Sequence, residues 1–449
     1  MASLWARASE MAGKAPPERN RYVDFLRALS IMAVVVGHWL VAAPYMQDGA
    51  VQGGHLLGIL PWTQWLTWGF QVMPLFFLVG GFANGMSWAA ALRDSGRDGG
   101  NWPDWFGARV QRLIGPVLPV LLIWSLLAAF GTALGMERSV VKLAAQLALV
   151  PVWFLAVYLI VTALVPLSHA AWRRLGMASF WALVAGAVAV DVAALALHVP
   201  YVNLLNFLFV WLAVHQLGYA WNAGRFARPA KALVWGLGGL AALVLLVRFG
   251  PYPIAMIGVP GSELSNSMPP TLAMLALGLA QTGFALALEP RMRALLDNLR
   301  LWTGVVLLNG MIMTIYLWHL TGFVLVLVAA WLLGGIGLDV APGSADWWLA
   351  RPVWFALYIA ALLPLIGLFA RFERVSAGKA AARPIPHWRL ITGLVMICIG
   401  LAATAAISIA SPLGVTGVRL WVVALPVIGA ALVRFGPGYR AAQRVRGKR

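Results

Sequence analysis

An arginine and a histidine lie eleven residues apart in the first long apolar stretch of the chain, Arg21 to Pro44. Eleven helical residues make three turns plus about 20°, so Arg27 and His38 would share one helix face about 16 Å apart. Ionisable groups at membrane depth are costly and tend to face a protein interior or a watery cavity. A guanidinium can hold anionic groups, and a neutral imidazole suits general-base catalysis near neutral pH. The spacing therefore predicts a functional site along one helix face.

These side chains also have structural interpretations. Arg27 could anchor the helix at the membrane surface by extending its charged end toward water. Asp24, three residues earlier, could pair with Arg27 and so reduce the cost of burying the start of the helix. A histidine near a helix end, such as His38, is often only a hydrogen-bonded packing residue. Taken one by one, the three residues leave both interpretations open.

The composition indicates a membrane protein, because 61% of the residues are hydrophobic and 11% are charged. Such a chain has too little polar surface to cover a soluble globule. The net charge of +18 does not indicate nucleic-acid binding, since the basic residues lie in short loops and at the two ends. Cys398 is the single cysteine and is expected to be a packing residue, and no His, Asp or Glu spacing indicates a metal site.

Twelve apolar segments can serve as membrane spans, which predicts an all-α, polytopic transmembrane helix bundle without a soluble domain. Residues 1–20 do not resemble a cleavable signal peptide, so the first span is expected to stay in the protein. The run 303–334 is expected to include a non-helical or interfacial part. The predicted spans are residues 23–44, 68–92, 113–135, 147–168, 177–198, 203–221, 232–249, 270–288, 303–334, 350–370, 389–410 and 418–433.

The distribution of basic residues predicts that both termini are cytoplasmic. With this orientation, 28 of the 33 Lys and Arg residues fall at inner ends of the spans, as membrane proteins prefer. Arg27 would then lie near the cytoplasmic surface, and His38 would lie well across the bilayer. A coenzyme A thioester has a matching shape, because its anionic phosphates and its reactive carbon are separated by a long thin arm. We therefore expect an integral, multi-pass protein of the plasma (inner) membrane.

Five segments, in order, resemble the membrane acyltransferase 3 family. The first contains Arg27, ten intervening residues and His38, and the resemblance covers about residues 21–372, or ten predicted spans. The other four are Pro74 to Phe82 (PLFFLVGGF), Arg109-Val-Gln-Arg112, Trp153-Phe154-Leu155 with Tyr158, and Ile315-Tyr316-Leu317-Trp318-His319.

The resemblance implies a function and a set of site residues. Members of the family O-acylate glycans, lipids and secondary metabolites, with an acyl-CoA donor that enters from the cytoplasm. His38 would be the essential histidine and Arg27 its motif partner. Arg109 and Arg112 would hold the phosphates of the donor, although the same pair also fits ordinary cytoplasmic loop charge.

Four residues are candidates for binding the acceptor or for supporting the site, and Asp24 in the first span is one of them. Tyr316 and His319 lie mid-span, where His319 could bind acceptor, orient the site, or be a hydrogen-bonded core residue. Asp191, near the outer end of its span, could contact an acceptor hydroxyl or form a buried ion pair. Gly80 stands where the family usually has Ser, which argues against a serine nucleophile, and the pair Gly80-Gly81 favours close helix packing.

These observations predict an acyltransferase that moves an acetyl or other short acyl group from cytosolic acyl-CoA to a hydroxyl of a glycan, glycolipid or small metabolite. No tightly bound cofactor or metal and no nucleic acid are expected, and membrane lipid surrounds the bundle. A transporter or flippase of an anionic or glycolipid cargo is the alternative. The expected regions are a cytoplasmic tail (1–20), an acyltransferase core (21–372), a loop with two additional transmembrane helices (373–433) and a basic cytoplasmic tail (434–449).

Overall fold

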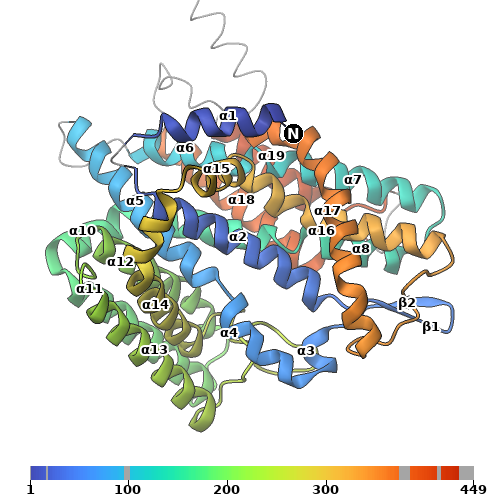
Figure 1. Ribbon diagram of the computed structural model, residues 1–449, viewed down its shortest axis with the longest axis horizontal. Coiled ribbons are helices and arrows are strands. Elements are labelled where there is room, and N and C mark those ends of the chain that lie inside the picture. The colour runs from blue at the N-terminus through green and yellow to red at the C-terminus, as the bar shows by residue number, and fades with distance from the viewer. Residues whose placement is uncertain (1, 17–18, 96–101, 374–384, 412–415, 434–449) are drawn as a thin grey trace, which may run out of the picture. The chain divides into compact units, whose positions relative to one another are not determined.

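The computed structural model is almost entirely helical (Figure 1). It describes residues 2–16, 19–95, 102–373, 385–411 and 416–433, so the predicted tail 434–449 and most of the loop after 373 lie outside the described residues. The elements are α1 Ala2–Gly13, α2 Arg21–Val41, β1 Tyr45–Gln47, β2 Ala50–Gln52, α3 Leu56–Ile59, η1 Pro61–Leu66, α4 Thr67–Phe70, α5 Met73–Ser95, α6 Trp102–Ile114, α7 Val117–Ala133, α8 Arg138–Leu149, α9 Val152–Ala163, α10 Val165–Leu175, α11 Met177–Leu195, η2 Val202–Leu205, α12 Asn206–Asn222, α13 Pro229–Phe249, α14 Leu272–Leu296, α15 Leu299–Asn309, α16 Ile312–Leu332, α17 Ala345–Glu373, α18 His387–Ile407 and α19 Leu420–Leu432.

The prediction of an all-α polytopic bundle is confirmed. Within the described residues, eleven helical segments are long and apolar enough to cross a membrane, and β1 and β2 form a three-residue antiparallel pair. The eleven segments are Arg21–Val41, Pro61–Asp94, Trp102–Ala133, Arg138–Ala163, Met177–Leu195, Val202–Asn222, Pro229–Phe249, Leu272–Leu296, Ile312–Leu332, Ala345–Glu373 and His387–Ile407.

The expected irregularity in the run 303–334 is present. The run divides into α15, which ends at Asn309, and α16, which begins at Ile312. At the break, the amide of Gly310 donates to the carbonyls of Val306 and Leu307, which closes the last turn of α15. The break places the side chain of Asn309 at a helix end, where its amide can bond to other segments.

The region around Arg138 differs from the prediction. The sequence placed Arg138 and Lys142 in a loop, whereas both lie in α8, whose buried positions include Val141 and Ala145 at helical spacing. The chain breaks near Pro151, where a residue without an N–H cannot continue the ladder of helix hydrogen bonds, and α9 begins at Val152.

The last predicted span forms a short helix that folds back on its predecessor. The 13 residues of α19 are fewer than the roughly 20 that cross a bilayer. An antiparallel bridge joins Ala410 to Val418, and a Cβ built on Gly393 would lie 2.8 Å from the carbonyl oxygen of Gly429. The backbones of the two helices are therefore in close contact, and α19 runs back along α18 as far as the second turn of α18.

The chain forms two compact units. The first comprises Met1–Ala89, Leu164–Ile312 and Gly335–Arg351. In it α13 packs along α14 (Figure 1), α11 and α14 contact α12, and α1 and α2 contact α15. Its core includes Phe77 and Trp211, which are fully buried and stacked with ring centroids 4.5 Å apart.

The second unit comprises Ala90–Ala163, Met313–Gly334 and Pro352–Arg449. Here α18 packs on α9 and α19, while α6 contacts α7, α9 and α18. Trp318 of α16 stacks on Phe369 of α17 with centroids 4.0 Å apart. The additional helices α18 and α19 are thus packed into this unit.

Candidate functional site

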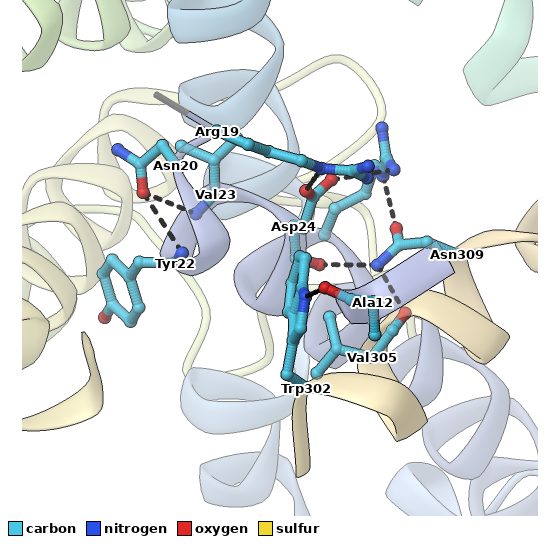
Figure 2. A network of polar contacts seen from close by, with 10 residues as sticks. Ala12, Arg19, Asn20, Tyr22, Val23, Asp24, Trp302, Val305 and Asn309 are labelled. Carbon is cyan, nitrogen blue, oxygen red and sulfur yellow. Dashed lines mark hydrogen bonds and ion pairs between the residues drawn. The ribbon is translucent and has the colours of Figure 1, made fainter. Parts of the chain in front are cut away.

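The start of α2 is fixed by a helix cap and by a hydrogen bond to a neighbouring helix. The side chain of Asn20 accepts from the backbone amides of Tyr22 and Val23, which leaves fewer unsatisfied amides at the start of the helix (Figure 2). The hydroxyl of Tyr22 is buried and donates to the carbonyl of Ala285 on α14 at 2.6 Å. These contacts set the position of the helix that carries Arg27 and His38.

Asp24 lies at the centre of a network of charges and amides (Figure 2). Its Oδ2 accepts from Nε of Arg19 at 2.6 Å, and its Oδ1 accepts from Nη2 of Arg27 at 3.1 Å. Asn309 joins the network from α15, because its Oδ1 accepts from Nε of Arg27 at 2.6 Å. The Nδ2 of Asn309 donates to the carbonyls of Asp24 and Val305, both at 2.9 Å.

This network orients the Arg27 guanidinium. The predicted Asp24–Arg27 ion pair is present, with the Asp24 side chain 11% exposed and the Arg27 side chain 37% exposed. Two partners hold the planar guanidinium in one orientation while part of the side chain stays accessible. Sequence reasoning missed Asn309, since no local spacing connects it to Arg27.

Two further arginines flank the network and share one aromatic ring. Their Cζ atoms lie 5.5 Å (Arg19) and 5.4 Å (Arg21) from the ring of Trp302. The indole N–H of Trp302 donates to the carbonyl of Ala12 at 3.2 Å, and Nη1 of Arg21 donates to the carbonyl of Leu296 at 2.9 Å. The start of α2 is therefore rich in positive charge and is braced by α1, α14 and α15.

His38 lies in the last turn of α2. The helix is continuous from Arg21 to Val41, so the eleven-residue spacing places Arg27 and His38 on one face. On this face Arg27, Val34 and His38 are partly exposed, whereas Ile31 and Val35 beside them are buried.

Arg109 and Arg112 lie on α6 in the second unit. The Cζ of Arg109 is 3.7 Å from the centre of the Trp105 ring, and its Nη1 donates to the Trp105 carbonyl at 3.0 Å. Arg109 is partly exposed and Arg112 is exposed. Residues three apart share a helix face, so the pair presents two guanidinium groups on the same side of α6.

Tyr316 and His319 are buried in α16, and Tyr316 contacts the segment around Trp153-Phe154-Leu155 that the sequence singled out. The Tyr316 hydroxyl donates to the carbonyl of Pro151 at 2.7 Å, and Phe154 packs edge-on against the Tyr316 ring with centroids 6.0 Å apart. Nδ1 of His319 is 2.7 Å from the carbonyl oxygen of Tyr316. Because a carbonyl can only accept, Nδ1 carries a proton in this contact.

Glu373, at the end of α17, fixes the first turn of α16. Its Oε1 accepts from the amide of Met313 at 3.0 Å, and its Oε2 accepts from the amide of Thr314 at 3.0 Å and from the Thr314 hydroxyl at 2.9 Å. A carboxylate at a helix start satisfies free amides and opposes the positive end of the helix dipole. It thereby sets the position of Tyr316 and His319, one and two turns further along.

Replacing Glu373 with Gln should lower the free energy of unfolding by about 1–2 kcal/mol, because one accepting carboxylate oxygen becomes an amide NH₂ group, which donates and cannot accept. Thermal unfolding of the purified protein in detergent measures this change. Glu263→Gln removes the same charge from an exposed loop residue and should leave the unfolding temperature unchanged. Equal transitions for Glu373→Gln and the parent protein would contradict this assignment.

Asp191 joins several segments at one buried carboxylate. Its Oδ1 accepts from Asn206 at 2.7 Å, and its Oδ2 accepts from the Tyr252 hydroxyl and the Leu272 amide, both at 2.8 Å. Burial, and then the charge of Asp191, raise the pKa of Tyr252, so this hydroxyl stays a donor. These contacts favour a structural role, the bracing of the start of α14, over binding of an acceptor hydroxyl.

The glycine-rich segment of α5 serves helix packing. A Cβ on Gly81 would overlap the carbonyl oxygen of His215, and one on Gly218 would overlap the backbone of α5 at Leu78. The packing interpretation of Gly81 is therefore confirmed. His215 is fully buried beside these glycines, with Nε2 3.3 Å from the amide nitrogen of Asn84.

The predicted site residues thus fall into two groups. Asp24, Arg27 and His38 lie together on α2 in the first unit, which also contains Asp191, whereas the arginine pair of α6 and the residues Tyr316 and His319 belong to the second. Within the described part of the chain, no three His, Cys, Asp or Glu side chains are placed to hold a metal ion.

Comparison with known proteins agrees with the ordered motifs. A family model described as an acyltransferase domain, that of acyltransferase 3, matches residues 20–371. Searches of curated proteins and of solved structures gave no significant match. The matched region contains the Arg27–His38 helix, the α6 arginine pair and the Tyr316–His319 segment. The family match covers most of the chain, and the protein therefore belongs to the acyltransferase 3 family of membrane acyltransferases.

Proposed function

We propose that this acyltransferase moves an acetyl or other short acyl group from cytosolic acyl-CoA to a hydroxyl of a glycan, glycolipid or small metabolite. The observation that carries the proposal is the geometry of α2. Arg27 is held near one end by Asp24 and Asn309, and His38 lies three turns away on the same partly exposed face. The thioester arm of coenzyme A can extend over the about 16 Å between them.

His38 would act on the acceptor hydroxyl. As a general base, the neutral imidazole takes the hydroxyl proton while the oxygen attacks the thioester carbonyl. The C–S bond then breaks, and the imidazolium returns the proton to the departing thiolate. In the second form of the mechanism, a nitrogen of His38 attacks the thioester carbonyl, the C–S bond breaks and coenzyme A leaves as its thiolate. The acceptor hydroxyl then attacks the acylated histidine, the N–C bond breaks, and the hydroxyl proton passes through the imidazole to the thiolate.

The arginines would bind the donor rather than take part in bond making. Arg109 is oriented by the Trp105 ring, which limits the freedom of its guanidinium before a phosphate binds. Arg112 supplies a second charge on the same helix face, and Arg27 supplies one on α2. A planar guanidinium group can donate several hydrogen bonds to one phosphate group.

We further propose a plasma-membrane location with both termini in the cytoplasm. The excess of basic residues at the inner ends of the spans supports this orientation. The antiparallel packing of α19 on α18 supports it as well, since the chain returns toward the side from which α18 began. The start of α2, with its arginines, would then face the cytosolic donor.

Binding of radiolabelled acetyl-CoA to purified protein tests the donor site. The parent protein should bind saturably, and the Arg109→Ala, Arg112→Ala double variant should bind about tenfold more weakly or worse, because charged contacts to phosphate are lost. Arg173→Ala with Arg174→Ala removes two exposed charges at the end of α10 and serves as the control. Equal affinities of the two double variants would reject the proposed donor site.

A further inference from the structure

The first unit contains a cavity of about 300 Å³ between the segment that follows β2 and the loop that joins α13 to α14. Cavities of this size are at the lower end of those that hold small molecules in proteins. The residues that line it are Leu57, Gly58, Gln64, Pro253, Ala255, Ile257, Val259, Pro260, Gly261, Ser262 and Leu264.

Hydrogen bonds fix the walls of this cavity. The Trp68 indole N–H donates to the carbonyl of Ile254 at 2.9 Å, and the Met256 amide donates to the Thr67 hydroxyl at 2.9 Å. Asn266, which is fully buried, donates through Nδ2 to the carbonyl of Pro253 at 2.7 Å. The loop is therefore fastened to α4 and to itself, which preforms the cavity.

The chemistry of the lining selects a neutral ligand with hydroxyl groups. None of the eleven lining residues is charged, so an ion would lose its hydration without a compensating partner. Gln64 donates one amide hydrogen to the carbonyl of Leu57 at 3.1 Å, and its second hydrogen and its carbonyl oxygen can serve a ligand. The Ser262 hydroxyl donates to the carbonyl of Leu264 at 2.9 Å, so its oxygen can still accept a hydrogen bond from a ligand. Pro253, Pro260 and the aliphatic side chains suit the apolar faces of a sugar ring.

The helices α3 and α4, which carry or fasten the cavity wall, contact α2, and two contacts of this region lie near His38. A Cβ on Gly37, next to His38, would lie 3.7 Å from the side chain of Phe70, in the helix that fastens the loop. The amide of Ala43, just after α2, donates to the carbonyl of Gly54 at 3.0 Å, and the cavity wall begins three residues later at Leu57. The histidine end of the helix and the cavity thus belong to one continuous, hydrogen-bonded region.

Aromatic residues beside Gln64 indicate the depth of the cavity in the membrane. Trp62 and Trp65 are 55% and 53% exposed, as expected of tryptophans at a membrane–water interface. A position at that interface would give the cavity access to hydroxylated molecules from the water and to lipid head groups from the bilayer.

We propose that this cavity binds the acceptor through an uncharged, hydroxylated ring such as a neutral hexose. This inference rests on the proposed function, because it assigns the acceptor subsite of the same reaction. The ring would be held by Gln64, Ser262 and backbone carbonyls, with a hydroxyl directed to the His38 end of α2.

Ligand-observed NMR on protein in lipid nanodiscs tests the proposal, with methyl β-glucopyranoside as the probe and methyl β-glucuronoside as its anionic counterpart. The neutral glycoside should give saturation transfer, and the anionic one should bind about tenfold more weakly or not at all. In a Cys398→Ala background, Ser262→Cys modified with a bulky maleimide should abolish the signal. Glu263→Cys, modified in the same way at an exposed neighbour outside the lining, should keep it.

Measurements on the same samples distinguish a failure of the proposed acceptor subsite from a failure of the proposed function. Absence of glycoside binding, equal binding of the anionic sugar, or a signal that survives modification of Ser262→Cys would overturn the acceptor subsite even if acetyl-CoA binds. Failure of acetyl-CoA binding would instead count against the proposed function. Displacement of the probe by a glucosyl diacylglycerol in the nanodisc would identify the sugar source as lipid-linked, and its absence would identify a soluble sugar.

Discussion

The His38→Ala protein is expected to lose acyl transfer by a factor of about 10² to 10⁴, the usual contribution of a general acid–base group. Binding of acetyl-CoA should change little, because the proposed phosphate contacts are made by Arg27 and the α6 arginines. Transfer of the labelled acyl group to the native acceptor, together with donor binding by the same samples, measures both effects. His387→Ala, at an exposed histidine that begins α18, is the control.

Rapid quenching distinguishes the two roles of His38. If the histidine is the nucleophile, label from acetyl-CoA should stay on the parent protein before the acceptor is added, and should be absent from His38→Ala. If it is the base, no label should be retained by either. Undiminished transfer by His38→Ala would refute both roles, and transport of intact cargo by that variant would favour a transporter or flippase.

Gly218→Ala is expected to destabilise the protein strongly. The added methyl group would overlap the Leu78 carbonyl oxygen and the Phe82 amide of α5, and backbone atoms cannot rotate away as side chains do. The helices must then separate, which disturbs the stacked pair Phe77 and Trp211. Overpacking of this kind costs about 1–3 kcal/mol or more, so the variant should accumulate poorly in membranes and unfold at a lower temperature.

Gly238→Ala provides the matched control for this substitution. Gly238 lies in α13 of the same unit, and a Cβ there would meet no atom within 4 Å. Alanine favours helix over glycine by about 1 kcal/mol, so this variant should be as stable as the parent or more so. Similar melting temperatures for the two variants would show that the close contact between α5 and α12 is not required.

The features that the sequence predicted depend on local pattern. Continuous apolar length indicated the spans, and three-residue spacing indicated the Asp24–Arg27 pair, because both follow from the geometry of one helix. The helix break in the run 303–334 was expected for the same reason, since the run exceeds the length of one span.

The features that the sequence did not predict depend on contacts between distant segments. Asn309 meets Arg27 across 282 residues, and Glu373 caps a helix whose first turn lies about 60 residues earlier. Nothing in the spacing of these polar residues identifies their partners. The same limit explains why the hydrogen bonds of Asp191 were not predicted, since its three partners come from three other parts of the chain.

The bond from Trp302 to Ala12 makes the extreme N-terminus relevant to the charge at the start of α2. The indole ring that this bond orients lies under the guanidinium groups of Arg19 and Arg21, and Arg19 shares the Asp24 carboxylate with Arg27. A version of the protein trimmed to the residues that match the family would lack this brace. Arg19 would be lost as well, and the Trp302 ring beneath Arg21 would no longer be held by Ala12, so the charge at the start of α2 in a truncated form would differ from that of the full chain.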